Sequence, residues 1–92
     1  MKREIRFTGS FRKDLKLAKR QGRNIEKLFE VIGILADGGI LEERYRDHGL
    51  SGQYSDVREC HIESDWLLIY QIVEDSNVLV LDRIGTHSEL FR

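Results

Sequence analysis

Apolar and charged residues alternate at the start of the chain, in the segment REIRFT (residues 3–8). Ile5 and Phe7 occupy every second position there, which is the spacing of one face of a strand. Gly9-Ser10 follows and supplies a turn and a helix N-cap. The next apolar residues recur at helical spacing, at Phe11, Leu15 and Ala18. The pattern therefore predicts a short strand and then an amphipathic helix that ends near Gln21-Gly22.

A second helical pattern begins after Asn24, whose side chain can cap a helix N-terminus. The apolar stripe of this helix consists of Ile25, Leu28, Phe29, Ile32 and Leu35. Gly38-Gly39 ends the helix, because glycine adopts the left-handed conformation at helix C-termini without strain. The short loop between the two helices predicts an antiparallel pair. Residues 40–53 are polar and are predicted to be irregular.

Three strands are predicted in the second half of the chain. Residues 54–62 alternate partly, whereas residues 66–73 and 78–84 are nearly continuous apolar runs, as expected of strands buried on both faces. Residues 74–77 form a hairpin turn, and residues 87–91 form a short C-terminal tail. The expected fold is α+β, in the order β-α-α-β-β-β. An N-terminal strand and an antiparallel helical hairpin would pack on a mostly antiparallel four-stranded sheet.

The composition is that of one small folded domain. The chain has 92 residues, 40% hydrophobic and 34% charged, so residues 1–92 are expected to build a single core. No apolar run reaches the ~18 residues of a membrane span. The N-terminal segment MKREIRFTGSFRKD lacks the apolar stretch of a secretion signal. The single cysteine, Cys60, cannot form an internal disulfide. We therefore expect a cytoplasmic protein with no membrane contact.

Charge is distributed unevenly along the chain. Residues 1–27 hold ten lysines and arginines against three acidic residues, a net charge of +7. Residues 28–92 have a net charge of −8, so the whole chain is close to neutral at −1. A basic surface of this kind can bind phosphates, but basic residues also cover helices simply because they face water.

Titratable residues flank a tight turn in the segment ECHIESDW (residues 59–66). Strand periodicity places Cys60 and Ile62 on one face and His61 with Glu59 on the other. Because Cys60 and Ile62 suit the core, His61 is expected on the open face, with Asp65 within reach across the turn. The alternative for Asp65 is a turn residue that accepts backbone hydrogen bonds.

Two further histidines, His48 in the irregular segment and His87 in the tail, could join this pair. Histidine titrates near neutral pH, so a set of histidines with an aspartic acid of raised pKa can divide the roles of general base and general acid. Each histidine taken alone is more often a surface residue. The catalytic hypothesis therefore requires that His48, His61, Asp65 and His87 converge.

Arg83 interrupts the apolar run VLVLDRIG, and Arg58 lies in the predicted strand of residues 54–62. An unpaired buried guanidinium is too costly, so each must be paired or must face a polar cleft. Asp82 or Glu59 could pair with either arginine. Alternatively, Arg83 could contact a phosphate, because its forked donors match phosphoryl oxygens.

Three aromatic residues could stack on unpaired bases: Trp66, Tyr54 and Phe91. Core filling is the alternative, and it is favoured for Trp66 but not for Phe91, one residue from the end of the chain. A metal site or cofactor is not expected, since the histidines include no close pair of the H-x₃-H type. Cys60 is not expected to be a nucleophile, because burial raises the pKa of a thiol.

These residue types suit metal-free cleavage of RNA. A base removes the proton of the 2′-hydroxyl, the oxygen attacks the adjacent phosphorus, and an acid protonates the departing 5′-oxygen.

The segment YRDHGLSGQYSDVRECHIESDWLLIY, together with LDRIGTHSELF, closely resembles the YafQ-type toxins of the RelE/ParE superfamily. The matching patterns are D-H-x-L-x-G, R-x-x-H-I-x-x-D-W and R-x-G-[TS]-H-x-x-L-F. The N-terminal FTGSFRKDLKLAKRQG is similar to the first helix of this family, so the resemblance covers nearly the whole chain. Tyr54 stands where the family pattern often has tryptophan.

The resemblance implies an mRNA interferase that enters the ribosomal A site, cleaves the message without a metal, and is held inactive by a DinJ-like antitoxin. Its partners would be that antitoxin, the 16S rRNA of the ribosome and mRNA. By resemblance, the catalytic residues are His48, His61, Asp65 and His87, and the substrate-binding residues are Arg83, Trp66, Phe91 and Tyr54. Asp65 or His87 would be the acid, and His61 a base or a phosphate-orienting group.

Two other readings stay open at this point. The same scaffold serves ParE-type toxins, which block DNA gyrase without catalysis. The second alternative is a ribonuclease that acts on free RNA, or a degenerate family member that only binds a partner. The histidine and aspartate set favours the enzyme, since a pure binding protein does not need such groups.

Overall fold

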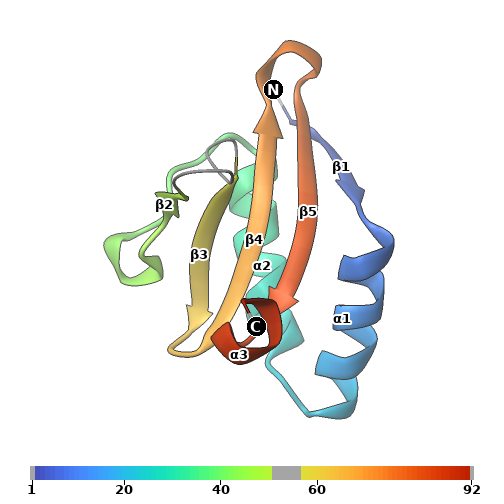
Figure 1. The fold of residues 1–92 in the computed structure, drawn as a ribbon. Coiled ribbons are helices and arrows are strands. Elements are labelled where there is room, and N and C mark those ends of the chain that lie inside the picture. The colour runs from blue at the N-terminus through green and yellow to red at the C-terminus, as the bar shows by residue number, and fades with distance from the viewer. Residues whose placement is uncertain (1, 51–56, 92) are drawn as a thin grey trace.

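The computed structural model of the chain describes residues 2–50 and 57–91. Figure 1 shows a sheet with two long helices and a short C-terminal helix. The elements in chain order are β1 (Glu4–Phe7), α1 (Gly9–Arg20), α2 (Ile25–Ala36), the 3₁₀ helix η1 (Glu43–Tyr45), β2 (His48–Gly49), β3 (Arg58–Glu63), β4 (Trp66–Val73), the 3₁₀ helix η3 (Glu74–Ser76), β5 (Val78–Gly85) and α3 (His87–Leu90). No helix within the described residues is long and apolar enough to span a membrane.

The sheet has five strands in the order β1-β5-β4-β3-β2, rather than the four that were predicted. β1 runs parallel to β5, and the other neighbours are antiparallel. The additional strand, β2, lies in residues 40–53, which were predicted to be irregular. Its two residues have no apolar alternation, and it forms through pairing with β3, with His48 opposite Glu59 and Gly49 opposite Arg58. The α+β class is confirmed.

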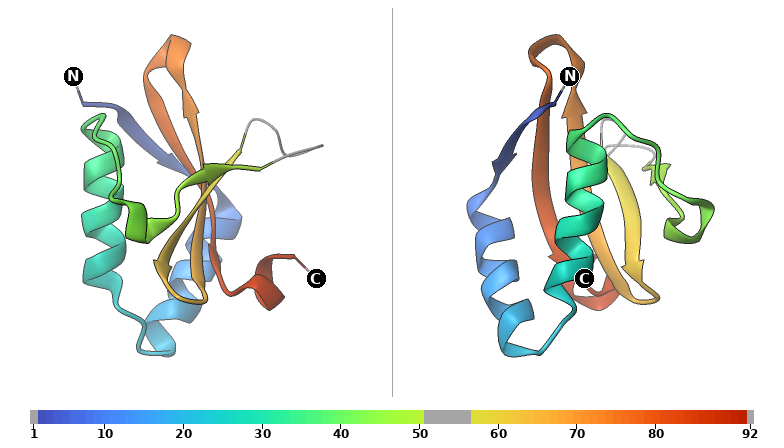
Figure 2. Two further views of the ribbon diagram at one scale, coloured as in Figure 1. Left: turned by 90° about the vertical axis from the view of Figure 1, so that its left-hand side faces the viewer. Right: turned by 180° about the vertical axis from the view of Figure 1, so that it is seen from behind.

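Side-chain caps set the starts of the helices. The hydroxyl of Thr8 accepts a hydrogen bond from the Phe11 backbone N–H at 3.0 Å, so Thr8 caps α1 and the predicted Gly9-Ser10 cap is wrong. Asn24 caps α2 as predicted, accepting from the Lys27 N–H at 3.1 Å. α1 and α2 lie on the same side of the loop that joins them, so the chain runs in opposite directions along the two helices (Figure 2, right).

The main core lies between α2 and one face of the sheet. Leu28, Ile32 and Leu35 of the predicted stripe are buried there, and Val31 is fully buried with them. Phe29, which was predicted to belong to the stripe, is 51% exposed. Val31 takes the buried place because it lies three or four residues from both Leu28 and Leu35, on the same helical face.

A β-bulge between β4 and β5 changes which residues of β5 face the core. Tyr70 pairs with Leu81, but the preceding Ile69 pairs with Arg83, so Asp82 is an extra residue on β5. Leu81 therefore faces the core before the bulge and Ile84 faces it afterwards. Arg83 consequently shares the opposite face with Ile69. That face also carries α3, which lies across the sheet from α2 (Figure 2, left).

Candidate active site

The predicted catalytic residue of β3 lies on the face of the sheet opposite α2. Cys60 and Ile62 belong to the core, so Glu59 and His61 point to the other face, as the strand period predicts. Burial raises the pKa of the Cys60 thiol to about 12. The thiol therefore stays protonated near neutral pH and is not a nucleophile.

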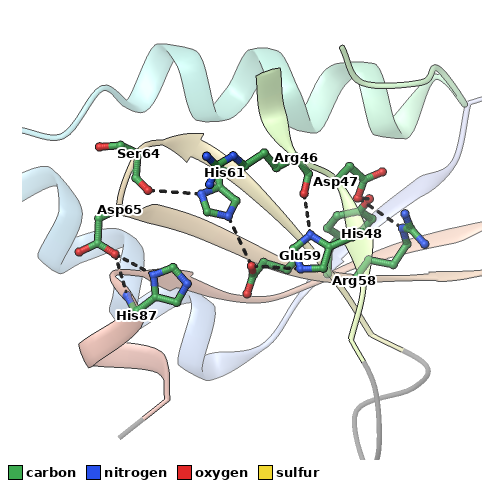
Figure 3. A network of polar contacts seen from close by, with 10 residues as sticks. Arg46, Asp47, His48, Arg58, Glu59, His61, Ser64, Asp65 and His87 are labelled. Carbon is green, nitrogen blue, oxygen red and sulfur yellow. Dashed lines mark hydrogen bonds and ion pairs between the residues drawn. The ribbon is translucent and has the colours of Figure 1, made fainter. Parts of the chain in front are cut away.

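Glu59 lies between two of the predicted catalytic histidines (Figure 3). Its Oε2 is 3.4 Å from Nε2 of His48 and 3.5 Å from Nε2 of His61. Glu59 is only 5% exposed, and no other charged residue within the described part of the chain is buried. A buried carboxylate requires compensating positive charge or hydrogen-bond donors. The two imidazole rings supply the contacts that offset the burial of this carboxylate.

Backbone carbonyls fix the tautomers of the two rings that face Glu59. Nδ1 of His48 is 2.7 Å from the carbonyl oxygen of Arg46, and Nδ1 of His61 is 3.3 Å from that of Ser64. A carbonyl oxygen can only accept, so each Nδ1 carries a proton. The chemistry of both rings is therefore confined to Nε2, on the side of Glu59.

Asp47 anchors the segment that carries His48. Its Oδ1 accepts hydrogen bonds from Nε of Arg58 at 3.3 Å and from the hydroxyl of Tyr70. Burial first, and then the Asp47 carboxylate, raise the pKa of Tyr70, so its hydroxyl remains a donor. Arg46 adopts the left-handed conformation (φ 48°), which turns its carbonyl toward the ring of His48. These contacts connect β2 to β3 and β4 and hold His48 beside the sheet.

Asp65 and His87 form a second polar pair. Oδ1 of Asp65 accepts hydrogen bonds from the His87 backbone N–H at 3.1 Å and from its Nδ1 at 3.0 Å (Figure 3). These bonds, the backbone one first, hold the pKa of Asp65 below its ordinary value of 3.8. Asp65 is therefore a carboxylate at neutral pH, which orients His87 and leaves Nε2 of that ring open. Of the two candidates for the acid, this geometry favours His87.

α3 places His87 beside His61. Thr86 and Glu89 form a capping box at the start of α3, which fixes the first helical residue, His87. The ring centroids of His61 and His87 are 5.9 Å apart. The ring of Phe91 lies 6.1 Å from that of His87 and is 46% exposed, so it can stack on a base.

The four predicted catalytic residues are thus brought together. His48 and His61 are joined through Glu59, while Asp65 holds His87 next to His61. The strand period placed Glu59 on the same face as His61, but the only role expected for it was that of a partner for an arginine. Its position between two histidines was not predicted.

The two strand arginines are paired, but with other partners than those considered. Arg83 makes a two-pronged contact with Asp14 of α1, with Nε to Oδ2 at 2.7 Å and Nη2 to Oδ1 at 3.2 Å. Arg58 pairs with Asp47. Asp82 instead accepts a hydrogen bond from Gln71 at 2.7 Å. The phosphate contact proposed for Arg83 stays a prediction.

The predicted role of Trp66 in base stacking is wrong. Its ring is 1% exposed and belongs to the core, with the guanidinium of Arg23 5.6 Å from the ring centroid. The core-filling alternative is therefore correct for Trp66, because the even-numbered residues of β4 all face the helices. Tyr54, the third aromatic candidate, lies outside the described residues.

Residues 3–92 match the family described as "Bacterial toxin of type II toxin-antitoxin system, YafQ". The chain belongs to the YafQ family. The mRNA interferase toxin YafQ of Escherichia coli K12 is 35% identical over 92 residues, covering 99% of this chain and 98% of the relative. The YafQ resemblance seen in the sequence motifs is therefore confirmed.

Solved YafQ structures share the fold over the whole chain. The Escherichia coli DinJ-YafQ toxin-antitoxin complex matches with a TM-score of 0.91 and 34% identity, covering 100% of both chains. A metal-bound toxin from Helicobacter pylori matches with a TM-score of 0.92 and 44% identity, covering 97% of this chain and 99% of that one. Within the described residues of this YafQ chain, no three His, Cys, Asp or Glu side chains are arranged to hold a metal ion.

Proposed function

We propose that this YafQ chain is the toxin of a type II toxin–antitoxin system and an endoribonuclease that cleaves mRNA in the ribosomal A site. Family membership and the mRNA interferase relatives support the activity. The observation that carries the proposal is that His61 lies next to the His87–Asp65 pair. The centroids of the two imidazole rings are 5.9 Å apart. Two rings at that separation can act on opposite sides of one phosphodiester.

His61 is the proposed general base. Its Nδ1 proton is held by the Ser64 carbonyl, so Nε2 is the atom that takes the proton of the 2′-hydroxyl. The 2′-oxygen then forms a bond to the adjacent phosphorus. Glu59, 3.5 Å from Nε2, stabilises the imidazolium that results, and His48 shares the same carboxylate oxygen.

His87 is the proposed general acid. The imidazolium form of the ring is the proposed acid, with its Nδ1 proton held by Asp65 and its Nε2 proton available for transfer. As the bond from phosphorus to the 5′-oxygen breaks, Nε2 gives its proton to that oxygen. The products are a 2′,3′-cyclic phosphate and a 5′-hydroxyl. Phe91, beside His87, would stack on a neighbouring base, and Arg83 would contact a phosphate.

The ribosome is the proposed site of action. The toxin would therefore act in the cytoplasm. The first 27 residues have a net charge of +7, which suits contact with the phosphates of 16S rRNA. The open face of the sheet, which carries the histidines, would then face the message. Gyrase inhibition is not favoured, because it would leave the converging acid–base groups without a role.

A DinJ-like antitoxin is the proposed inhibitor. A solved relative is a complex of YafQ with DinJ. In this chain, a groove of about 360 Å³ between β1, α1 and α2 is lined almost entirely by apolar side chains, among them the exposed Ile5, Phe7 and Phe29. The guanidinium of Arg12 lies over Phe7 at 5.1 Å from the ring centroid and adds positive charge to the groove. An amphipathic acidic segment of the antitoxin fits this chemistry.

Cleavage of an mRNA positioned on ribosomes tests the proposal directly. We expect cuts at the A-site codon that leave 2′,3′-cyclic phosphate ends, at an unchanged rate in the presence of a chelator. His61→Ala and His87→Ala should each lower the rate by about two orders of magnitude or more. Asp75→Ala, on the exposed η3 turn, should not change it. Equal cleavage by all these variants, or chelator-sensitive cleavage restored by a metal, would contradict the proposed mechanism.

A further inference from the structure

A basic pocket adjoins the proposed active site on the side of His61. The pocket has a volume of about 320 Å³ and lies between α2, η1 and the end of β3. Besides His61, its walls include three cationic side chains, Lys27, Arg44 and Arg46, and one acidic side chain, Glu63. We propose that this pocket binds a phosphate group of RNA next to the position of cleavage. The inference rests on the proposed ribonuclease function and extends its substrate site.

A buried tyrosine organises two of the three cations. Tyr45 of η1 is 4% exposed, and the guanidinium of Arg44 lies 4.8 Å from its ring centroid. Arg44 also donates a hydrogen bond to the Tyr45 hydroxyl at 3.0 Å. Nζ of Lys27, from α2, lies 6.0 Å from the centroid of the same ring. The cations therefore come from two elements and are held at one place by a fixed aromatic ring.

The third cation is connected directly to the active site. Arg46 has the left-handed backbone conformation, and its carbonyl oxygen accepts the Nδ1 proton of His48 at 2.7 Å. The residue that fixes one catalytic ring thus also supplies a side chain to the wall of the pocket. An anion bound there is adjacent to both His61 and the segment that carries His48.

The charges in the pocket favour an anion over water alone. Among the described residues, no acidic side chain lies within 4.0 Å of the side-chain nitrogens of Lys27 or Arg46. Arg44 pairs with Glu42 at 3.2 Å, but both side chains are more than 60% exposed, so the pair is weak and exchangeable. Bringing three cations together costs electrostatic free energy that a bound phosphate offsets. Guanidinium groups match the oxygens of a phosphate with forked donors.

Two strands could supply the phosphate: the message being cut, or the ribosomal RNA around it. Both present the same chemistry to the pocket, and cleavage of a short free oligonucleotide separates them from each other. A contact with the message lowers activity on the free oligonucleotide and on ribosomes alike. A contact with ribosomal RNA lowers activity only on ribosomes.

A charge-removing triple variant tests the pocket. Lys27→Gln, Arg44→Gln and Arg46→Gln together should raise KM for the RNA about tenfold or more while leaving kcat within about twofold, because binding and not proton transfer is lost. The salt dependence of binding gives a second readout, measured on an uncleavable RNA with a 2′-deoxy residue at the cut site. The slope of log affinity against log salt should be about 2 smaller in magnitude for the triple variant than for the parent. Glu63→Gln should act in the opposite direction and lower KM.

The matched control removes the same charge elsewhere. Lys13→Gln, Lys16→Gln and Lys19→Gln lie on the exposed side of α1 and line no part of this pocket. On the free oligonucleotide, where ribosomal RNA plays no part, the control triple should leave KM and the salt slope unchanged. The inference is overturned if the pocket triple changes KM and the salt slope no more than the control triple on either substrate. A parent protein that cuts no RNA at all would instead refute the proposed function itself.

Discussion

His87 donates two hydrogen bonds to a single carboxylate oxygen of Asp65, one from its backbone N–H at 3.1 Å and one from its ring Nδ1 at 3.0 Å. Asp65 belongs to the turn after β3, and His87 is the first residue of α3, so the contact joins two segments that are 22 residues apart. It fixes the ring, its tautomer and the start of α3 together. Nε2 of His87 is left as the atom available for proton transfer.

Asp65→Asn should lower cleavage by about two orders of magnitude, because the amide no longer stabilises the imidazolium of His87. The side chain is similar in size, so the protein should remain folded. Single-turnover cleavage with and without ribosomes measures the effect. Asp75→Asn, on the exposed η3 turn, is the control and should retain full activity.

The same pair predicts how stability depends on pH. The folded protein lowers the pKa of Asp65, so the carboxylate contributes stability at pH values above its ordinary pKa of 3.8. This contribution disappears as the pH falls through the lowered pKa. Urea unfolding should therefore distinguish the parent from Asp65→Asn at pH 7, and the difference should shrink toward pH 2. A constant difference over this range would show that the carboxylate contributes no charge-dependent stability.

Glu59→Gln tests the carboxylate between the two histidines. The amide keeps the volume but cannot stabilise the imidazolium that forms at His61 during cleavage, so cleavage should fall about tenfold or more. Glu59→Asp keeps the charge and should restore part of the parent rate. Parent activity in Glu59→Gln, with the protein shown to be folded by its melting curve, would remove Glu59 from the mechanism.

Period-two and helical spacing located the elements and the open face of β3 from the sequence. Those patterns are local, and they were right for His61 and for the buried Cys60. They failed where a distant contact decides the outcome. The strand β2 exists because His48 pairs with Glu59, and no apolar repeat marks it.

The arginine partners were missed for a related reason. Asp14 and Arg83 are 69 residues apart, and only the packing of α1 against β5 brings them together. The bulge at Asp82 changes the phase of β5 in the middle of the strand, which simple alternation cannot anticipate. The catalytic set itself came from family motifs, since no periodicity links His48 to His87.

Gly85→Ala should disturb the start of the helix that carries His87. A Cβ at this position would lie 2.9 Å from Oε1 of Glu89 and 3.2 Å from Cδ2 of Leu90, so these side chains must move. Oε1 of Glu89 accepts a hydrogen bond from the Thr86 N–H, so this movement weakens the capping box of α3. We expect cleavage to fall about tenfold or more, with a loss of about 1–3 kcal/mol in unfolding free energy.

Gly33→Ala is the matched control for this glycine substitution. Gly33 lies within α2, and a Cβ there meets nothing within 4 Å. Alanine should therefore stabilise the helix by about 0.4–1 kcal/mol and leave cleavage unchanged. If Gly85→Ala retained parent activity, the position of α3 would not be critical for catalysis.

The apolar groove gives the antitoxin interaction its own test. Phe29→Glu places a negative charge on a side chain that is 51% exposed and lines the groove, so it should weaken antitoxin binding about thirtyfold while the protein stays folded. Ile40→Glu makes the same change at a residue that is 95% exposed and outside the groove, and it should not affect binding. Arg12→Glu should weaken binding further, because it would repel an acidic segment. The purified Phe29 and Ile40 variants, without antitoxin, should cleave RNA like the parent, since the groove and the histidines lie on different elements. Equal antitoxin affinity of the Phe29 and Ile40 variants would place the antitoxin on another surface.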